Sequence, residues 1–110
     1  MTTIFEALAD PTRRRILDLL RERPHLVGEL VNQLKISQPL MSKHLRVLRE
    51  VGLVQVRQDA QRRWYTLRPE PLVEVDTWLT SYRHLWEARL DRLNDYLQEL
   101  QEEKERHDQD

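Results

Sequence analysis

The sequence predicts a mainly α-helical fold of the winged helix-turn-helix class, in the order α-α-α-α-β-β-α, with a long C-terminal dimerisation helix. Three observations predict this fold. Two short amphipathic segments are joined by a tight turn at residues 35–36. A basic hairpin follows them, between residues 53 and 67. A regular apolar stripe then starts at Leu72 and continues to residue 100.

Capping residues and prolines indicate where the helices before the turn begin and end. A first helix is expected over roughly residues 3–9. Asp10 is a good N-cap and Pro11 a good first helical residue, so a second helix is expected to begin there. Pro24 ends this second helix, because proline is not tolerated in a helix interior.

The third and fourth helices, over about 26–34 and 38–50, are predicted to form the helix-turn-helix unit, with Ser37 as the N-cap of the fourth. On a helical wheel, one side of the fourth helix is apolar. The opposite arc collects polar and basic residues: Gln38, Pro39, Ser42, Lys43, Arg46, Arg49 and Glu50. Glutamine can pair bidentately with adenine, and arginine or lysine can contact guanine or phosphate. This arc therefore favours a helix that binds the major groove of double-stranded DNA.

The hairpin is expected to be a cationic wing. Leu53–Arg57 and Arg63–Leu67 are predicted strands around the turn at 59–61. Arg57, Arg62 and Arg63 lie close to this turn. A two-stranded ribbon that carries cations suits contact with phosphate or with the minor groove, which fixes register more than it selects sequence.

The charge of the chain is divided between its two parts. The formal net charge is −1, but residues 1–69 hold 13 Lys and Arg against 7 Asp and Glu, a balance of +6. Residues 70–110 hold 5 Lys and Arg against 12 Asp and Glu, a balance of −7. DNA affinity depends on the local field rather than on the total charge. We therefore expect a DNA-binding domain over 1–69 and an acidic C-terminal helix over 70–110.

The C-terminal helix carries a heptad-like apolar stripe with one four-residue stutter. A helix of this length is too long to bury its stripe on so small a domain, so a second copy of the chain is the expected partner. The interface of this homodimer is predicted to use Leu72, Val75, Leu79, Tyr82, Trp86, Leu90 and Leu93. Gln101–Asp110 lack apolar positions and are expected to fray.

Taken together, these motifs resemble the ArsR/SmtB family of prokaryotic winged-helix repressors. The matching segments, in order and spacing, are Phe5–Leu17, Val27–Leu30, Ser37–Pro39, Ser42–Leu45, Leu48–Val54 and Trp64–Leu67. The resemblance implies a homodimer that binds a two-fold symmetric operator and usually represses its own operon. It also implies DNA contacts at six positions beside the wing arginines: Ser37, Gln38, Ser42, Lys43, His44 and Arg46.

The positions where this family holds metals carry other residues here. The cysteine positions of the third helix align with Leu26 and Gly28. The ligand positions of the final helix fall near Pro69, Pro71, Tyr82 and Leu85. His84 and Glu87 have a suitable spacing for zinc but lack two further ligands, and the chain has no cysteine. The sequence therefore resembles the metal-independent branch, and we expect neither a metal nor a cofactor.

Other functions are weighed against this one. The four histidines form no nucleophile–base set and the two glycines no phosphate-binding loop, so an enzyme is not expected. Neither a signal peptide nor a membrane span is present, and we expect a cytoplasmic protein without membrane contact. Two alternatives stay open: a metal- or small-ligand-responsive repressor of the same family, and a coiled-coil adaptor for protein interactions.

Overall fold

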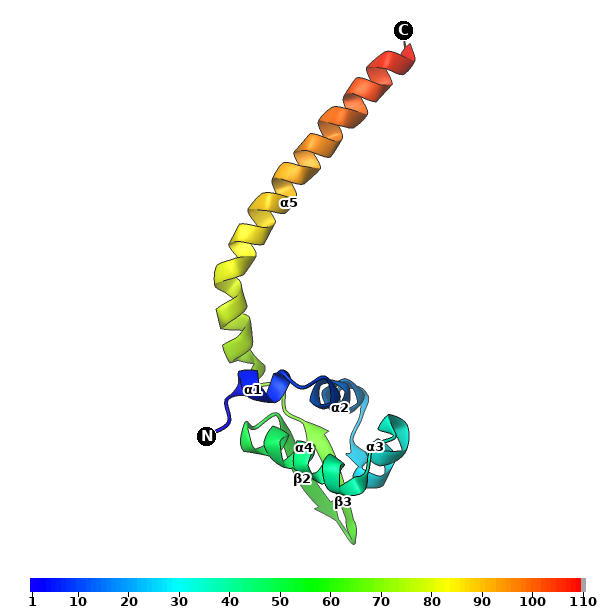
Figure 1. Cartoon of the computed structure of the whole chain (residues 1–110), viewed down its shortest axis with the longest axis vertical. Helices are drawn as coiled ribbons and strands as arrows, with labels where there is room; N and C mark the ends of the chain where they lie inside the picture. The colour runs from blue at the N-terminus through cyan, green and yellow to red at the C-terminus, as the bar shows by residue number, and fades with distance from the viewer. Residues whose placement is uncertain (110) are drawn as a thin grey trace. The chain divides into compact units, whose positions relative to one another are not determined.

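The computed structural model describes residues 1–109, and its contacts divide the chain into one unit over Met1–Val75 and a second that begins at Asp76. The elements are α1 (Ile4–Leu8), α2 (Pro11–Glu22), β1 (His25–Leu26), α3 (Val27–Leu34), α4 (Gln38–Glu50), β2 (Val54–Asp59), β3 (Arg62–Leu67) and α5 (Leu72–Gln109). Figure 1 shows the helices of the first unit gathered beside the β2–β3 hairpin. The predicted mainly helical, winged fold is confirmed, with the short strand β1 as an addition.

Helix α2 begins where the sequence predicts. The Oδ1 atom of Asp10 accepts hydrogen bonds from the amides of Thr12 and Arg13, at 2.8 and 3.1 Å. Partial burial raises the pKa of the Asp10 carboxyl. The two amide hydrogen bonds, together with the nearby Arg13 guanidinium, outweigh this effect, so the net shift of the pKa is downward. The cap thus remains ionised and satisfies the first amides of the helix.

The turn between α3 and α4 is as tight as predicted. Lys35 adopts the left-handed conformation with φ 57°, and its amide donates to the carbonyl of Val31 at 2.9 Å. Two residues later the Oγ atom of Ser37 accepts a hydrogen bond from the amide of Leu40 at 3.3 Å. The helix-turn-helix unit is therefore closed by local hydrogen bonds at both sides of the turn.

The sheet is antiparallel in the order β1-β3-β2. The hairpin pairs Asp59 with Arg62 beside the turn and Val54 with Leu67 at the far end. Strand β1 pairs Leu26 with Trp64 on the other side of β3. This strand was not predicted, because two residues are too few to show an alternating pattern.

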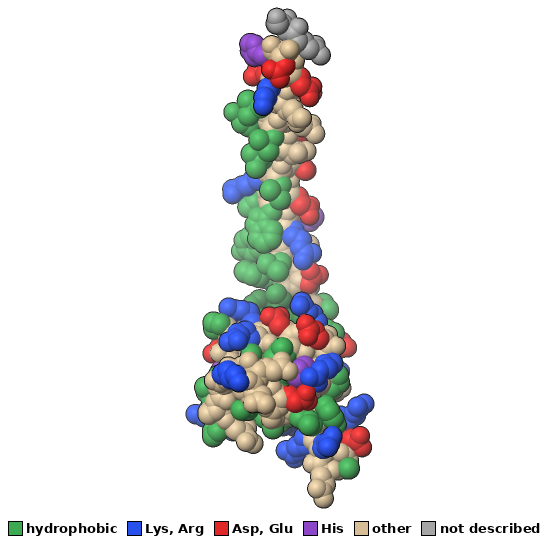
Figure 2. Space-filling model, turned by 90° about the vertical axis from the view of Figure 1, so that its right-hand side faces the viewer, with side chains coloured by type: hydrophobic (Ala, Val, Ile, Leu, Met, Phe, Trp, Pro, Cys, Tyr) green, Lys and Arg blue, Asp and Glu red, His purple; other side chains and the backbone are tan. Residues whose placement is uncertain are grey.

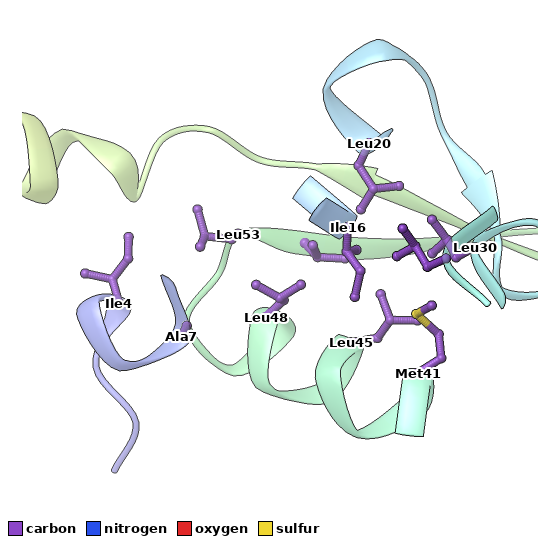
Figure 3. Close-up of a cluster of buried hydrophobic side chains, with 11 residues drawn as sticks. Ile4, Ala7, Ile16, Leu20, Leu30, Met41, Leu45, Leu48 and Leu53 are labelled. Carbon is purple, nitrogen blue, oxygen red and sulfur yellow. The ribbon is translucent and has the colours of Figure 1, made fainter. Parts of the chain in front are cut away.

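The core lies between the helices α1, α2, α3 and α4 and the sheet, as Figure 3 shows. Its largest fully buried apolar side chains are Ile16, Leu30, Met41, Leu45, Leu48 and Leu53. Three of these come from α4, so the apolar side predicted for this helix is confirmed. Since one side of α4 is fixed against the core, its opposite side is fixed toward solvent.

Two expectations for the final helix need correction. Helix α5 continues to Gln109, so it is longer than the roughly 30 residues that the apolar stripe predicts; Asp110 lies outside the described residues. Strong helix formers dominate this segment, and Glu102 and Arg106 are oppositely charged residues four positions apart. In addition, Leu72 and Val75 are partly buried against the core of the first unit, so they have less surface to offer a second copy than the exposed residues of the stripe from Tyr82 on. Among the described helices, none combines the length and apolarity needed to cross a membrane.

Candidate DNA-binding and self-association surfaces

The polar arc predicted on α4 is exposed in the structure. It presents Ser37, Gln38, Pro39, Ser42, Lys43 and Arg46 to solvent. One member of this surface was not predicted: Leu40 is 43% exposed although it lies beside the apolar side of the wheel. An apolar side chain at this position can contact the methyl group of thymine. The sequence feature that could have identified Leu40 is its place in the first turn of α4. The core covers the apolar side of this helix only from Met41 onward.

The first turn of α4 has few backbone amides left free to bind a phosphate. Pro39 has no N–H, the amide of Leu40 donates to Ser37 Oγ, and the amide of Met41 donates to the Ser37 carbonyl at 2.9 Å. The Ser37 hydroxyl can still donate its own proton, because the capping bond uses only its oxygen as an acceptor. Phosphate contact at this end therefore depends mainly on side chains.

The position of His44 corrects its assignment to the DNA contacts. Its side chain is turned inward and is only 8% exposed, and Nδ1 lies 3.3 Å from Nη1 of Arg13 on α2. The ring is held on the side of α4 that packs against α2, away from the exposed arc, so we do not expect it to reach a base edge. We therefore remove the side chain of His44 from the proposed contacts and keep its neighbours Lys43 and Arg46.

The wing arginines are exposed but lie on two faces of the hairpin. Side chains alternate along a strand, and Arg57 and Arg62 share the face of Trp64. Arg63 lies on the opposite face, which carries Tyr65 toward the core. Arg62 is in the strand pair beside the turn. Arg57 lines a surface hollow of about 340 Å³, which it shares with Arg23, Pro24 and Trp64. Arg62 and Arg63 are thus the residues nearest the tip.

The arginines at the start of α2 contribute little to this basic surface. Arg13 donates from Nε to the carbonyl of Ala7 at 2.7 Å and from Nη2 to the carbonyl of Glu6 at 3.0 Å. Arg14 donates to the carbonyl of Leu8 at 2.6 Å. These two side chains close the end of α1. Of the three consecutive arginines, Arg15 is left as the candidate for phosphate contact.

Helix α5 carries a continuous apolar stripe, which Figure 2 shows along one side of the second unit. Its exposed members are Trp78, Tyr82, Leu85, Trp86, Leu90, Leu93, Tyr96, Leu97 and Leu100. The exposed fraction reaches 64% at Leu90, and the rings of Trp78 and Tyr82 pack with centroids 5.2 Å apart. Exposed apolar patches of this extent mark interaction surfaces.

Comparison with known proteins identifies the family. Residues 10–56, from the cap of α2 into β2, match the model of the bacterial regulatory proteins of the arsR family. The chain is 32% identical to the transcriptional repressor SdpR of Bacillus subtilis over 82 residues, which cover 74% of this chain and 91% of that protein. The chain belongs to the ArsR family.

Two further comparisons agree. The HTH-type transcriptional regulator Rv2034 of Mycobacterium tuberculosis is 42% identical over 78 residues, covering 71% of this chain and 73% of that protein. The crystal structure of the ArsR-family transcriptional regulator RHA00566 superposes with a TM-score of 0.67 at 36% identity, covering 76% of this chain and 87% of that one. This ArsR-family protein is a DNA-binding transcriptional regulator, as the resemblance in sequence implied.

Proposed function

We propose that this ArsR-family regulator is a homodimeric repressor that binds a two-fold symmetric operator in front of its own operon. The observation that carries the proposal is the exposed polar arc of α4, which lies opposite the buried face formed by Met41, Leu45 and Leu48. The relative SdpR is named as a transcriptional repressor, which supports repression. A regulator of this kind works on DNA in the cytoplasm and needs neither catalysis nor a cofactor.

The contacts with DNA are proposed to divide into two kinds. Gln38, Ser42, Lys43 and Arg46 on α4 are exposed side chains with the hydrogen-bonding groups that base edges accept. Ser37 and Pro39 flank them at the helix start. The wing arginines are proposed to bind phosphate or the minor groove, with Arg62 and Arg63 nearest the tip and Arg57 farther from it.

Homodimerisation is proposed to use the apolar stripe of α5. Leu79, Tyr82, Trp86, Leu90 and Leu93 follow one another at spacings of three and four residues, and all but Leu79 are at least 46% exposed. Each such side chain contributes roughly 1.5–3 kcal/mol when it is fully buried. A second copy offers an identical stripe, and an isologous contact covers both at once.

We expect no metal to alter DNA binding at physiological concentrations. Within residues 1–109, no group of three or more His, Cys, Asp or Glu side chains is placed to hold a metal ion. Titrating zinc, cobalt, cadmium or arsenite into the protein–DNA complex checks this expectation. Stoichiometric metal binding with release of DNA would contradict it, and His84→Ala and Glu87→Ala would then be the first variants to examine.

The proposal is tested on the DNA that lies in front of its own gene. Fluorescence anisotropy with that fragment and with a shuffled fragment of equal length, at several salt concentrations, measures specificity and the electrostatic share of binding together. A repressor is expected to prefer its own fragment by about a thousandfold or more and to bind more weakly as salt rises. A coiled-coil adaptor would bind both fragments equally weakly or not at all.

A further inference from the structure

One guanidinium group joins three helices of the first unit. Arg13 on α2 holds the carbonyls of Glu6 and Ala7 at the end of α1, at 3.0 and 2.7 Å. Its Nη1 atom lies 3.9 Å from Oδ2 of Asp10 and 3.3 Å from Nδ1 of His44 on α4. The Arg13 side chain is only 16% exposed, and its contacts with Ala7 and His44 are partly buried, whereas the one with the Glu6 carbonyl is exposed.

The contact between Arg13 and His44 determines which atom donates the hydrogen bond and which accepts it. Arginine has donors and no acceptor, so the hydrogen bond from Nη1 requires a lone pair on Nδ1 of His44. The remaining buried contacts of α4 are apolar: Met41, Leu45 and Leu48 pack into the core. Apolar packing has no preferred direction, whereas a hydrogen bond has one. The Arg13–His44 bond is therefore the directional contact on the buried side of α4.

We propose that Arg13 and His44 are a positioning pair that fixes the rotation of α4 relative to the end of α1, and so aims the DNA-contacting arc. The proposal rests on the DNA contact proposed for α4. His44 is adjacent to Lys43 and two residues from Arg46, so a small rotation of the helix at His44 displaces both of these side chains. A shift of α1 is transmitted to the same arc through Arg13, because Arg13 binds both elements.

The test compares two replacements of His44 in the full chain bound to its own upstream DNA. His44→Leu fills a similar volume without an acceptor. His44→Asn keeps one, since its Oδ1 is attached through Cγ as Nδ1 is in histidine. His44→Leu is expected to weaken DNA binding about tenfold or more, and His44→Asn to restore most of this loss. Arg13→Lys breaks the same contact from the other side, and adding His44→Leu to it is expected to have little further effect.

A second readout separates positioning from general stability. In the wild type and in His44→Asn, DNA binding is expected to shift the amide resonances of Ala7 and Leu8 in α1; in His44→Leu this response is lost although the protein stays folded by circular dichroism. If His44→Leu does not fold, Arg13→Lys is compared with the wild type instead. DNA affinity and the response of the α1 amide resonances to DNA then test the positioning role.

The control is Arg46→Ala, which removes a proposed DNA contact and leaves the pair intact. If Arg46→Ala weakens binding while His44→Leu and Arg13→Lys bind like the wild type, the positioning role is wrong and the proposed DNA surface stands. If none of the three weakens binding, the DNA surface itself is wrong, and the positioning role fails with it.

Discussion

Replacing Leu79 and Leu90 by glutamate is expected to convert the protein into a monomer and to abolish specific DNA binding. Both residues lie in the apolar stripe of α5, and Leu90 is 64% exposed in the single chain. In a dimer, the new glutamates of both chains would be buried in an apolar interface without partners of opposite charge. Burial of this interface then becomes unfavourable. A monomer contacts one half-site, so its affinity should fall at least about a hundredfold, toward the nonspecific range. Sedimentation and DNA titration measure the two effects.

A matched control adds the same two charges away from the stripe. Ala88 and Gln98 lie on the opposite side of α5 and are exposed. The double variant Ala88→Glu with Gln98→Glu should remain a dimer with nearly unchanged affinity for DNA. A dimer that persists in Leu79→Glu with Leu90→Glu would show that the seam is assigned to the wrong surface.

Substitutions in the helix and in the wing are expected to weaken DNA binding in different ways. Gln38→Ala and Arg46→Ala remove exposed side chains of α4 and should each cost about 1–3 kcal/mol, with relaxed specificity at particular base pairs. Arg62→Ala and Arg63→Ala remove cations near the wing tip and should weaken binding on all sequences. Binding is described by the slope of the logarithm of the binding constant against the logarithm of the salt concentration. Each lost phosphate contact makes this slope less steep by about 0.9, or by about 1.8 for a dimer that loses the contact twice.

The salt slope and the base preference of each variant, measured on one set of operator mutants, separate these roles. Arg57→Ala is the internal comparison, because Arg57 lies farther from the tip and lines the hollow with Trp64. Its effect on the slope should be smaller than that of Arg62→Ala. An unchanged slope in Arg62→Ala and Arg63→Ala together with a lowered slope in Gln38→Ala would mean that the two roles are reversed.

Features set by short-range chemistry were predictable from the sequence. The cap at Asp10, the turn at Lys35 and the exposed arc of α4 each depend on a few neighbouring residues, and the structure agrees with all of them. The length of α5 was underestimated, because the absence of apolar positions after Leu100 was given more weight than the helix-forming residues that follow it.

Features set by contacts between distant residues were not predictable in the same way. A run of arginines at 13–15 has the composition of a phosphate-binding patch, but the carbonyls at the end of α1 bind Arg13 and Arg14. His44 has a DNA-contacting position by family resemblance, yet its ring meets Arg13, which is 31 positions away in the sequence. Leu72 belongs to the apolar period of α5 and packs against the core instead. No pattern within one helix contains this information.

The central claim, a dimer on a symmetric operator, is tested most directly by footprinting the DNA upstream of its own gene while the mass of the same complex is measured. We expect two protected segments related by two-fold symmetry, centred about one helical turn or a multiple of it apart, and two chains on each DNA fragment. A single asymmetric protected segment with one chain bound, or protection no stronger than on unrelated DNA, would contradict the claim.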